Sequence, residues 1–179
     1  AAIPEGLRWL PALSSLTAAG TLLSPLPATF FDGFPQLQQL DLSNTQLSVL
    51  PEFSRPSYPL QQLKLSYNFL SALPDSIGRL TNLTALYLSS NMLTSLPGSM
   101  ENLVSLETIA LDHNLLSSLP AGFSSSRISD IDLTNNQFTE FPSAVCSWLS
   151  LQSLDMSNNL LTAVSPCIGN LTNLQELTL

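Results

Sequence analysis

Leucine and other large apolar residues recur along the chain in a unit that returns about every 23 residues. The unit is clearest from Leu83 to Leu103, where apolar residues stand at the first, fourth and sixth positions and then at wider intervals. Corresponding units begin at Leu13, Leu37, Leu60, Leu83, Leu106, Ile128, Leu151 and Leu174, with spacings of 24, 23, 23, 23, 22, 23 and 23 residues. A period of this length is typical of repeat proteins, whose units stack into one elongated solenoid.

Each unit opens with leucines that alternate with small or polar residues, as around Leu86 and Leu88. This period-two alternation predicts a short strand with one buried face. One unit cannot bury its own leucines. We therefore expect neighbouring strands to pair in parallel and the leucines to form a continuous core along the stack.

A polar residue follows each predicted strand at a constant position. It is asparagine in five units, at Asn68, Asn91, Asn114, Asn136 and Asn159, and threonine in the first two, at Thr21 and Thr45. An amide both donates and accepts, so it suits a turn where the backbone leaves the sheet and its polar groups need partners. We expect a structural asparagine ladder, with a less regular N-terminal end where threonine replaces asparagine.

A Leu-Pro or Phe-Pro pair comes next in most units, at 26–27, 50–51, 73–74, 96–97, 119–120 and 141–142. Proline fixes φ, lacks an N–H and biases the preceding residue towards extended conformations. The return path is therefore predicted to be extended or to contain one tight helical turn. An apolar pair such as Met100 and Leu103 closes the unit, whereas the segment from Glu52 to Pro59 lacks this pair and is predicted to be an irregular loop.

Together these positions resemble the leucine-rich repeat family, whose units have the form L-x-x-L-x-L-x-x-N-x-L-x-x-L-P. The resemblance covers residues 13–179, about seven repeats and the start of an eighth. It implies an α/β-type solenoid, a right-handed curved superhelix with short parallel strands on its concave face and extended or 3-10 segments on its convex side. Residues 1–12 are expected to form an N-terminal flank or partial cap. Because Leu179 falls at the third strand position of a unit, we expect the natural protein to continue.

The residues between the strand leucines are expected to line the concave face. Tyrosine is enriched in binding hot spots, and charge of one sign steers partners of the other. Two features fit these rules: an aromatic and cationic patch of Lys64, Tyr67, Tyr87 and His113, and an acidic stripe of Asp112, Asp130, Asp132, Asp155 and Glu176. Tyrosine is also a good strand former, and aspartates also occur on purely solvated faces. Both explanations stay open at this point.

The sequence shows no catalytic constellation. His113 is the only histidine, and no serine stands in an obvious position beside it. Successive strand residues point to opposite faces, so Asp112 is not expected to orient its imidazole. Zinc-site spacing, a calcium loop and a glycine-rich phosphate loop are also missing. We expect no enzymatic activity, no metal site and no cofactor.

Charge and hydropathy narrow the class of partner. The chain has 13 acidic and 5 basic residues, a formal net charge of −8, which opposes binding to nucleic acid and to anionic membranes. No apolar run approaches the length of about 18 residues needed to cross a membrane, so no direct membrane insertion is expected. The expected partner is another protein or a peptide.

Two further features bear on the compartment. Cys146 and Cys167 fall in adjacent units and are a disulfide candidate, with two buried thiols as the alternative. Asn82 and Asn170 each begin an N-x-Thr sequon and are glycosylation candidates. With the scarcity of lysine, these features favour a secreted or cell-surface glycoprotein. A cytoplasmic location is the alternative, because Leu-Pro units of this length also resemble intracellular scaffold repeats.

The resemblance implies a non-catalytic protein-protein interaction module of a receptor, adhesion protein or scaffold, binding its ligand through the concave face. Two alternatives stay open. The chain is the substrate-targeting domain of a larger enzyme, or it is a structural component of an extracellular or large assembly.

Overall fold

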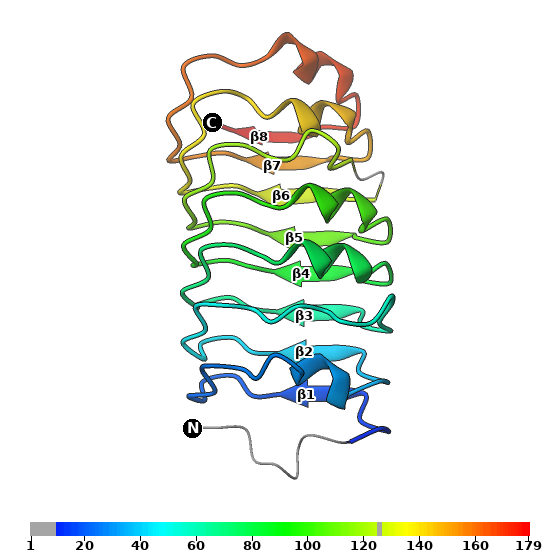
Figure 1. Cartoon of the computed structure of the whole chain (residues 1–179). Helices are drawn as coiled ribbons and strands as arrows, with labels where there is room; N and C mark the ends of the chain where they lie inside the picture. The colour runs from blue at the N-terminus through cyan, green and yellow to red at the C-terminus, as the bar shows by residue number, and fades with distance from the viewer. Residues whose placement is uncertain (1–9, 125–126) are drawn as a thin grey trace.

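The computed structural model describes residues 10–124 and 127–179, which form a single stack of coils (Figure 1). Each coil contributes one three-residue strand to a sheet of eight strands in chain order. The strands are β1 (Ser15–Thr17), β2 (Gln39–Asp41), β3 (Gln62–Lys64), β4 (Ala85–Tyr87), β5 (Thr108–Ala110), β6 (Asp130–Asp132), β7 (Ser153–Asp155) and β8 (Glu176–Thr178). Residues 1–9 of the expected N-terminal flank lie outside the described residues.

All neighbouring strands pair in parallel and keep one register, so equivalent residues of successive coils lie side by side. Leu40 pairs with Leu63, and Leu63 pairs with Leu86. These three side chains are at most 1% exposed, because the middle residue of each strand points into the stack. The residues before and after it face outwards. The predicted parallel sheet and its continuous leucine core are therefore confirmed.

The return path carries short 3-10 helices: η2 (Phe30–Gly33), η3 (Asp75–Arg79), η4 (Gly98–Asn102), η5 (Ser143–Ser147) and η6 (Pro166–Asn170). Extended prolines precede three of them, as at Pro74 with φ −67° and ψ 145°. The Ile77 N–H then donates to the Pro74 carbonyl at 3.0 Å, closing one tight turn. The expected extended path with a single helical turn is confirmed. No helix in the described part of the chain combines the length and hydropathy of a membrane span.

The expectation for the segment from Glu52 to Pro59 is wrong in one respect, because an apolar pair does fill this coil. Phe53 is fully buried and Tyr58 is 5% exposed. Phe53 stacks on Phe31 of the preceding coil, with ring centroids 4.1 Å apart, and meets Tyr58 edge-on at 5.4 Å. Two larger aromatic side chains at shifted positions thus occupy the space that Ile77 and Leu80 fill in the following coil.

The asparagines after the strands tie each coil to the one before it. The Asn91 side-chain amide donates to the carbonyls of Leu88 in its own coil and Leu65 in the preceding coil, both at 3.0 Å. Its side-chain oxygen accepts from the Leu70 N–H at 3.1 Å. The same three bonds recur at Asn68, Asn114, Asn136 and Asn159. At Thr45 the hydroxyl lies within hydrogen-bond distance of the Leu42 carbonyl in its own coil, at 2.7 Å, and of the Asn68 side-chain oxygen in the following coil, at 3.1 Å.

Close packing between adjacent return paths predicts an asymmetric response to two equivalent glycines. A Cβ on Gly78, the fourth residue of η3, would lie 2.7 Å from the Ser99 carbonyl oxygen of η4, whereas a Cβ on Gly169, the fourth residue of η6, would meet nothing within 4 Å. We expect Gly78→Ala to lower the free energy of unfolding by about 1–3 kcal/mol through overpacking. We expect Gly169→Ala to change it by less than about 0.5 kcal/mol.

Urea unfolding of the two glycine variants checks this expectation. Equal shifts in the midpoint would contradict the packing argument, since the two positions differ in their neighbours and not in their place within the coil.

Candidate binding surfaces

Outward-facing strand residues form two columns on the concave face. The column after the central leucines reads Thr17, Asp41, Lys64, Tyr87, Ala110, Asp132, Asp155 and Thr178, and strand pairing places each next to its successor. Backbone bonding within the sheet leaves these side chains free to contact solvent or a partner.

Lys64 and Tyr87 are the only pair of the predicted aromatic and cationic patch for which a contact is seen among the described residues. The Lys64 Nζ lies 5.7 Å from the centroid of the Tyr87 ring, within the range of a cation–π interaction. Both side chains are half-buried, on β3 and β4. The contact holds a positive charge and an aromatic surface together in the N-terminal half of the concave face.

Tyr67 and His113 lie elsewhere, in the turn that follows each strand. A column of residues with positive φ runs through these turns: Gly20, Asn44, Tyr67, Ser90, His113, Asn135 and Asn158. Tyr67 (φ 60°) and His113 (φ 55°) are two coils apart, with Ser90 between them. The structure therefore divides the predicted patch into a strand pair and two turn residues.

The expectation that Asp112 does not orient His113 is wrong. Asp112 Oδ2 lies 3.1 Å from His113 Nδ1, because both residues follow β5 and the left-handed backbone at His113 ends the strand alternation. The Ser89 hydroxyl donates to the other oxygen of Asp112 at 2.5 Å. Serine and histidine therefore both bond the carboxylate, and a nucleophile–base–acid chain does not form.

The acidic stripe is partly explained by local structure. Asp132 and Asp155 each accept a 2.8 Å hydrogen bond from the backbone N–H two residues on, and Asp41 accepts the same bond at 2.9 Å. These bonds close Asx turns at the strand ends. Asp130 is exposed and accepts from Ser129, and Glu176 is exposed on β8. Among the described residues, no group of three His, Cys, Asp or Glu side chains is placed to hold a metal ion.

The two sequons differ in their surroundings. Asn82 is exposed, but its side-chain amide nitrogen donates to the Tyr58 carbonyl at 3.1 Å. Asn170 is exposed at the last position of η6. An N-linked glycan attaches to that same amide nitrogen, so Asn170 is the more available of the two acceptors.

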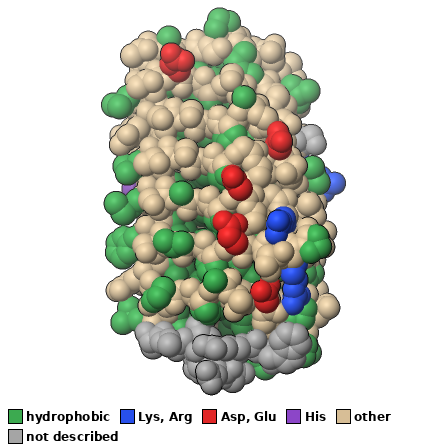
Figure 2. Space-filling view, viewed as in Figure 1, with side chains coloured by type: hydrophobic (Ala, Val, Ile, Leu, Met, Phe, Trp, Pro, Cys, Tyr) green, Lys and Arg blue, Asp and Glu red, His purple; other side chains and the backbone are tan. Residues whose placement is uncertain are grey.

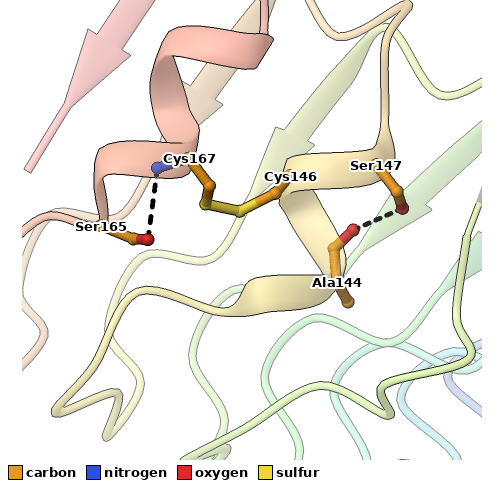
Figure 3. Close-up of a disulfide and its surroundings, with 5 residues drawn as sticks. All are labelled: Ala144, Cys146, Ser147, Ser165 and Cys167. Carbon is orange, nitrogen blue, oxygen red and sulfur yellow. Dashed lines mark hydrogen bonds between the residues drawn. A yellow bond between two sulfur atoms is a disulfide. The ribbon is translucent and has the colours of Figure 1, made fainter.

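Cys146 in η5 and Cys167 in η6 are joined by a disulfide bond between adjacent coils (Figure 3). Their Cα atoms are 5.6 Å apart, in the usual range for bonded cysteines. Ser165 caps η6 by accepting from the Cys167 N–H at 3.4 Å, next to the bond.

An apolar row follows the edge at which the strands end, and strand alternation does not predict it. The residue after each ladder position reads Leu22, Gln46, Phe69, Met92, Leu115, Gln137 and Leu160. Figure 2 shows hydrophobic side chains gathered along this edge, on the left of the view. We define the edge patch as Tyr67, Phe69, Ser90, Met92, His113 and Leu115, two side chains from each of three successive coils. In the sequence, the row could have been recognised because large apolar residues recur directly after the ladder position in several units.

Comparisons with known proteins agree with this geometry. One leucine-rich repeat profile matches residues 59–116, and a second matches residues 36–55 and 150–171. The chain belongs to the leucine-rich repeat family. No curated protein sequence matches it.

Solved leucine-rich repeat structures resemble almost the whole chain. A leucine-rich repeat protein of Leptospira interrogans is 28% identical with a TM-score of 0.68, over 98% of this chain and 52% of its own. The Drosophila Toll–Spatzle complex matches at 25% identity and TM-score 0.70, over 95% of this chain and 27% of that one. The ectodomain of the Arabidopsis thaliana receptor kinase GASSHO1/SCHENGEN3, in complex with CASPARIAN STRIP INTEGRITY FACTOR 2, matches at 26% and 0.69, over 93% and 22%. This leucine-rich repeat chain thus spans about half of the first protein and about a quarter of the other two.

Proposed function

We propose that this leucine-rich repeat chain is a non-catalytic recognition module that binds a protein or peptide through its concave face. The observation that carries the proposal is the contact between Lys64 and Tyr87, which presents an aromatic ring and an ammonium group side by side on the outer side of β3 and β4. Aromatic residues are enriched in interface hot spots. The carboxylates of Asp132 and Asp155 further along the same column favour a ligand with complementary charge at that end.

The structural neighbours support a recognition role. Two of them are complexes: Toll with Spatzle, and the ectodomain of a plant membrane receptor kinase with CASPARIAN STRIP INTEGRITY FACTOR 2. The bonding of Asp112 to both Ser89 and His113 uses the side chains that a hydrolytic site would need in another order. Both observations favour binding over catalysis.

We further propose that the protein is secreted or displayed at the cell surface. A disulfide between Cys146 and Cys167 persists in oxidising compartments, and an exposed sequon at Asn170 suits glycosylation there. Intact mass of the native protein before and after removal of N-glycans tests this location. Loss of mass supports it, and an unmodified, fully reduced chain contradicts it.

Selection of random 12-residue peptides on the immobilised protein tests concave-face binding. We expect the selected peptides to lose about tenfold or more in affinity when Lys64→Ala and Tyr87→Ala are combined, because truncated hot-spot residues typically cost more than 1 kcal/mol each. Fluorescence anisotropy of labelled peptides gives the dissociation constants.

The matched control combines Arg127→Ala with Val49→Ala, which also removes one cation and one large side chain. Arg127 and Val49 are exposed and lie outside the strands. Peptides that respond equally to both double variants, or to neither, would exclude the Lys64–Tyr87 pair as the binding element. Thermal unfolding of each variant shows whether the fold is intact.

A further inference from the structure

The edge patch has the composition of an interface centre. Tyr67, Phe69, Met92 and Leu115 are 65%, 56%, 49% and 38% exposed, although side chains of this kind are usually buried. In the same two columns the preceding coil carries Asn44 and Gln46, and the following coil carries Asn135 and Gln137. An apolar centre with aromatic residues and methionine inside a polar rim is the usual anatomy of a protein interface.

The backbone at Tyr67 indicates that this residue is not there for stability. Its φ of 60° lies in the left-handed region, which costs an ordinary L-residue about 1–2 kcal/mol. Four equivalent coils place glycine or asparagine there, at Gly20, Asn44, Asn135 and Asn158, and these residues take that conformation more readily, whereas Ser90 and His113 share it with Tyr67. The left-handed turn recurs along the stack, so the unusual feature here is that a large, exposed aromatic residue occupies it; residues held in such sparsely populated conformations cluster at functional sites.

The backbone N–H groups of the patch are already bonded within the stack, so they are not available to pair with an added strand. The N–H groups of Phe69, Met92 and Leu115 donate to Leu47, Leu70 and Leu93 of the preceding coils, at 2.7, 2.9 and 2.9 Å. Those of Tyr67 and His113 donate to Ser89 and Thr134, both at 2.9 Å. A partner must therefore bind through side chains, which is how an α-helix binds and not how a β-strand adds to a sheet edge.

We propose that the edge patch binds the apolar stripe of an amphipathic α-helix from a partner protein, with the helix axis along the stack. Parallel strands are spaced about 4.8 Å apart, so three coils offer apolar side chains over about 10 Å. Residues i, i+4 and i+7 of a helix span about 10.5 Å at 1.5 Å per residue. One such stripe matches Phe69, Met92 and Leu115 in turn. This surface is separate from the proposed concave-face site.

The charged side chains around the edge patch indicate which charge the partner helix should carry. Asp112 lies within the patch coils, beside His113, and Asp41 and Asp132 lie on the concave face in the coils just before and after the patch. These three carboxylates outnumber the one nearby lysine, Lys64 on β3, and the chain as a whole has a formal net charge of −8. On the other side, Ser71, Thr94 and Ser117 are uncharged. The helix that fits carries lysine or arginine beside its apolar stripe on the flank that faces the sheet.

A designed peptide provides the probe: an 18-residue helix with leucines on one stripe and lysines beside it, labelled for fluorescence anisotropy. Its control has the same composition in a scrambled order that disperses the leucines. We expect the striped peptide to bind, and Met92→Gln to weaken it about tenfold or more, as for a central interface residue. Gln137 already occupies this column with the same ordinary backbone region as Met92, so glutamine suits the fold there.

Leu160→Gln is the matched control variant, since Leu160 is 60% exposed in the same column but lies outside the three-coil patch. We expect it to change the affinity by less than about twofold.

The combined Lys64→Ala and Tyr87→Ala variant should bind the striped peptide no more weakly than the unchanged protein, which separates this surface from the concave-face site. No binding of the striped peptide at 1 mM, equal binding of the scrambled peptide, or equal effects of Met92→Gln and Leu160→Gln would each overturn the proposal. A dimer in sedimentation velocity that Met92→Gln dissociates would assign the patch to a second copy of the chain and overturn it as well.

Discussion

Asn91→Ala is expected to lower the free energy of unfolding by about 3–5 kcal/mol, since each buried backbone group left without a partner costs about 1–3 kcal/mol. The substitution removes the amide that bonds the Leu65 and Leu88 carbonyls and the oxygen that accepts from the Leu70 N–H. These groups lie inside the stack, where Asn91 is only 8% exposed. Urea unfolding monitored by circular dichroism measures the loss.

Two variants separate hydrogen bonding from packing. Asn91→Asp keeps the size of the side chain but replaces the donor with a carboxylate facing two carbonyl oxygens, so at pH 7 we expect it to destabilise at least as much as alanine. Asn159→Ala removes an equivalent set of bonds at a half-buried position, where water can replace them, and should cost less. Similar losses for Asn91→Ala and Asn159→Ala, together with a mild Asn91→Asp, would show that the ladder is not the source of the stability.

The repeat core could be predicted because the alternation of apolar and polar residues assigns each leucine to the buried face of its strand. Leu63 and Leu86 must be buried or the stack has no core, and the register follows from their constant spacing. The filling of the coil with Phe53 and Tyr58 was not predicted, because the repeat template considers only fixed apolar positions and these two aromatic residues stand at other positions. Volume, which the template ignores, decides how that coil is filled.

The turns after the strands were the least predictable part of the surface. Glycine or asparagine in a sequence favours a left-handed backbone conformation. Tyr67, Ser90 and His113 adopt the same conformation, although their residue types do not predict it. Strand alternation was therefore carried too far along the chain. Extending the alternation beyond the strand led to the wrong expectation that Asp112 and His113 face opposite sides. It also gave no prediction for the apolar row at Phe69, Met92 and Leu115, because these residues follow the strands.

The disulfide joins the last two 3-10 helices of the stack, η5 and η6. We expect replacement of both Cys146 and Cys167 by alanine to lower the free energy of unfolding by about 3 kcal/mol, the chain-entropy value for a loop of about 20 residues. The two cysteines are 21 residues apart in sequence and join η5 to η6. In a stack whose coils contact mainly their neighbours, the effect should centre on the last coils. Urea unfolding and amide hydrogen exchange measure its size and place.

Reduction of the unchanged protein provides the internal control. Dithiothreitol should lower its urea midpoint to that of the double alanine variant, and should leave the variant unchanged. An unaltered midpoint on reduction would show that the coils around η5 and η6 hold together without the bond. A large shift instead links the fold to an oxidising compartment, because in a reducing cytosol the protein would lack this contribution where β7 and β8 join the sheet. The stability measurement thereby also bears on the proposed location outside the cytosol.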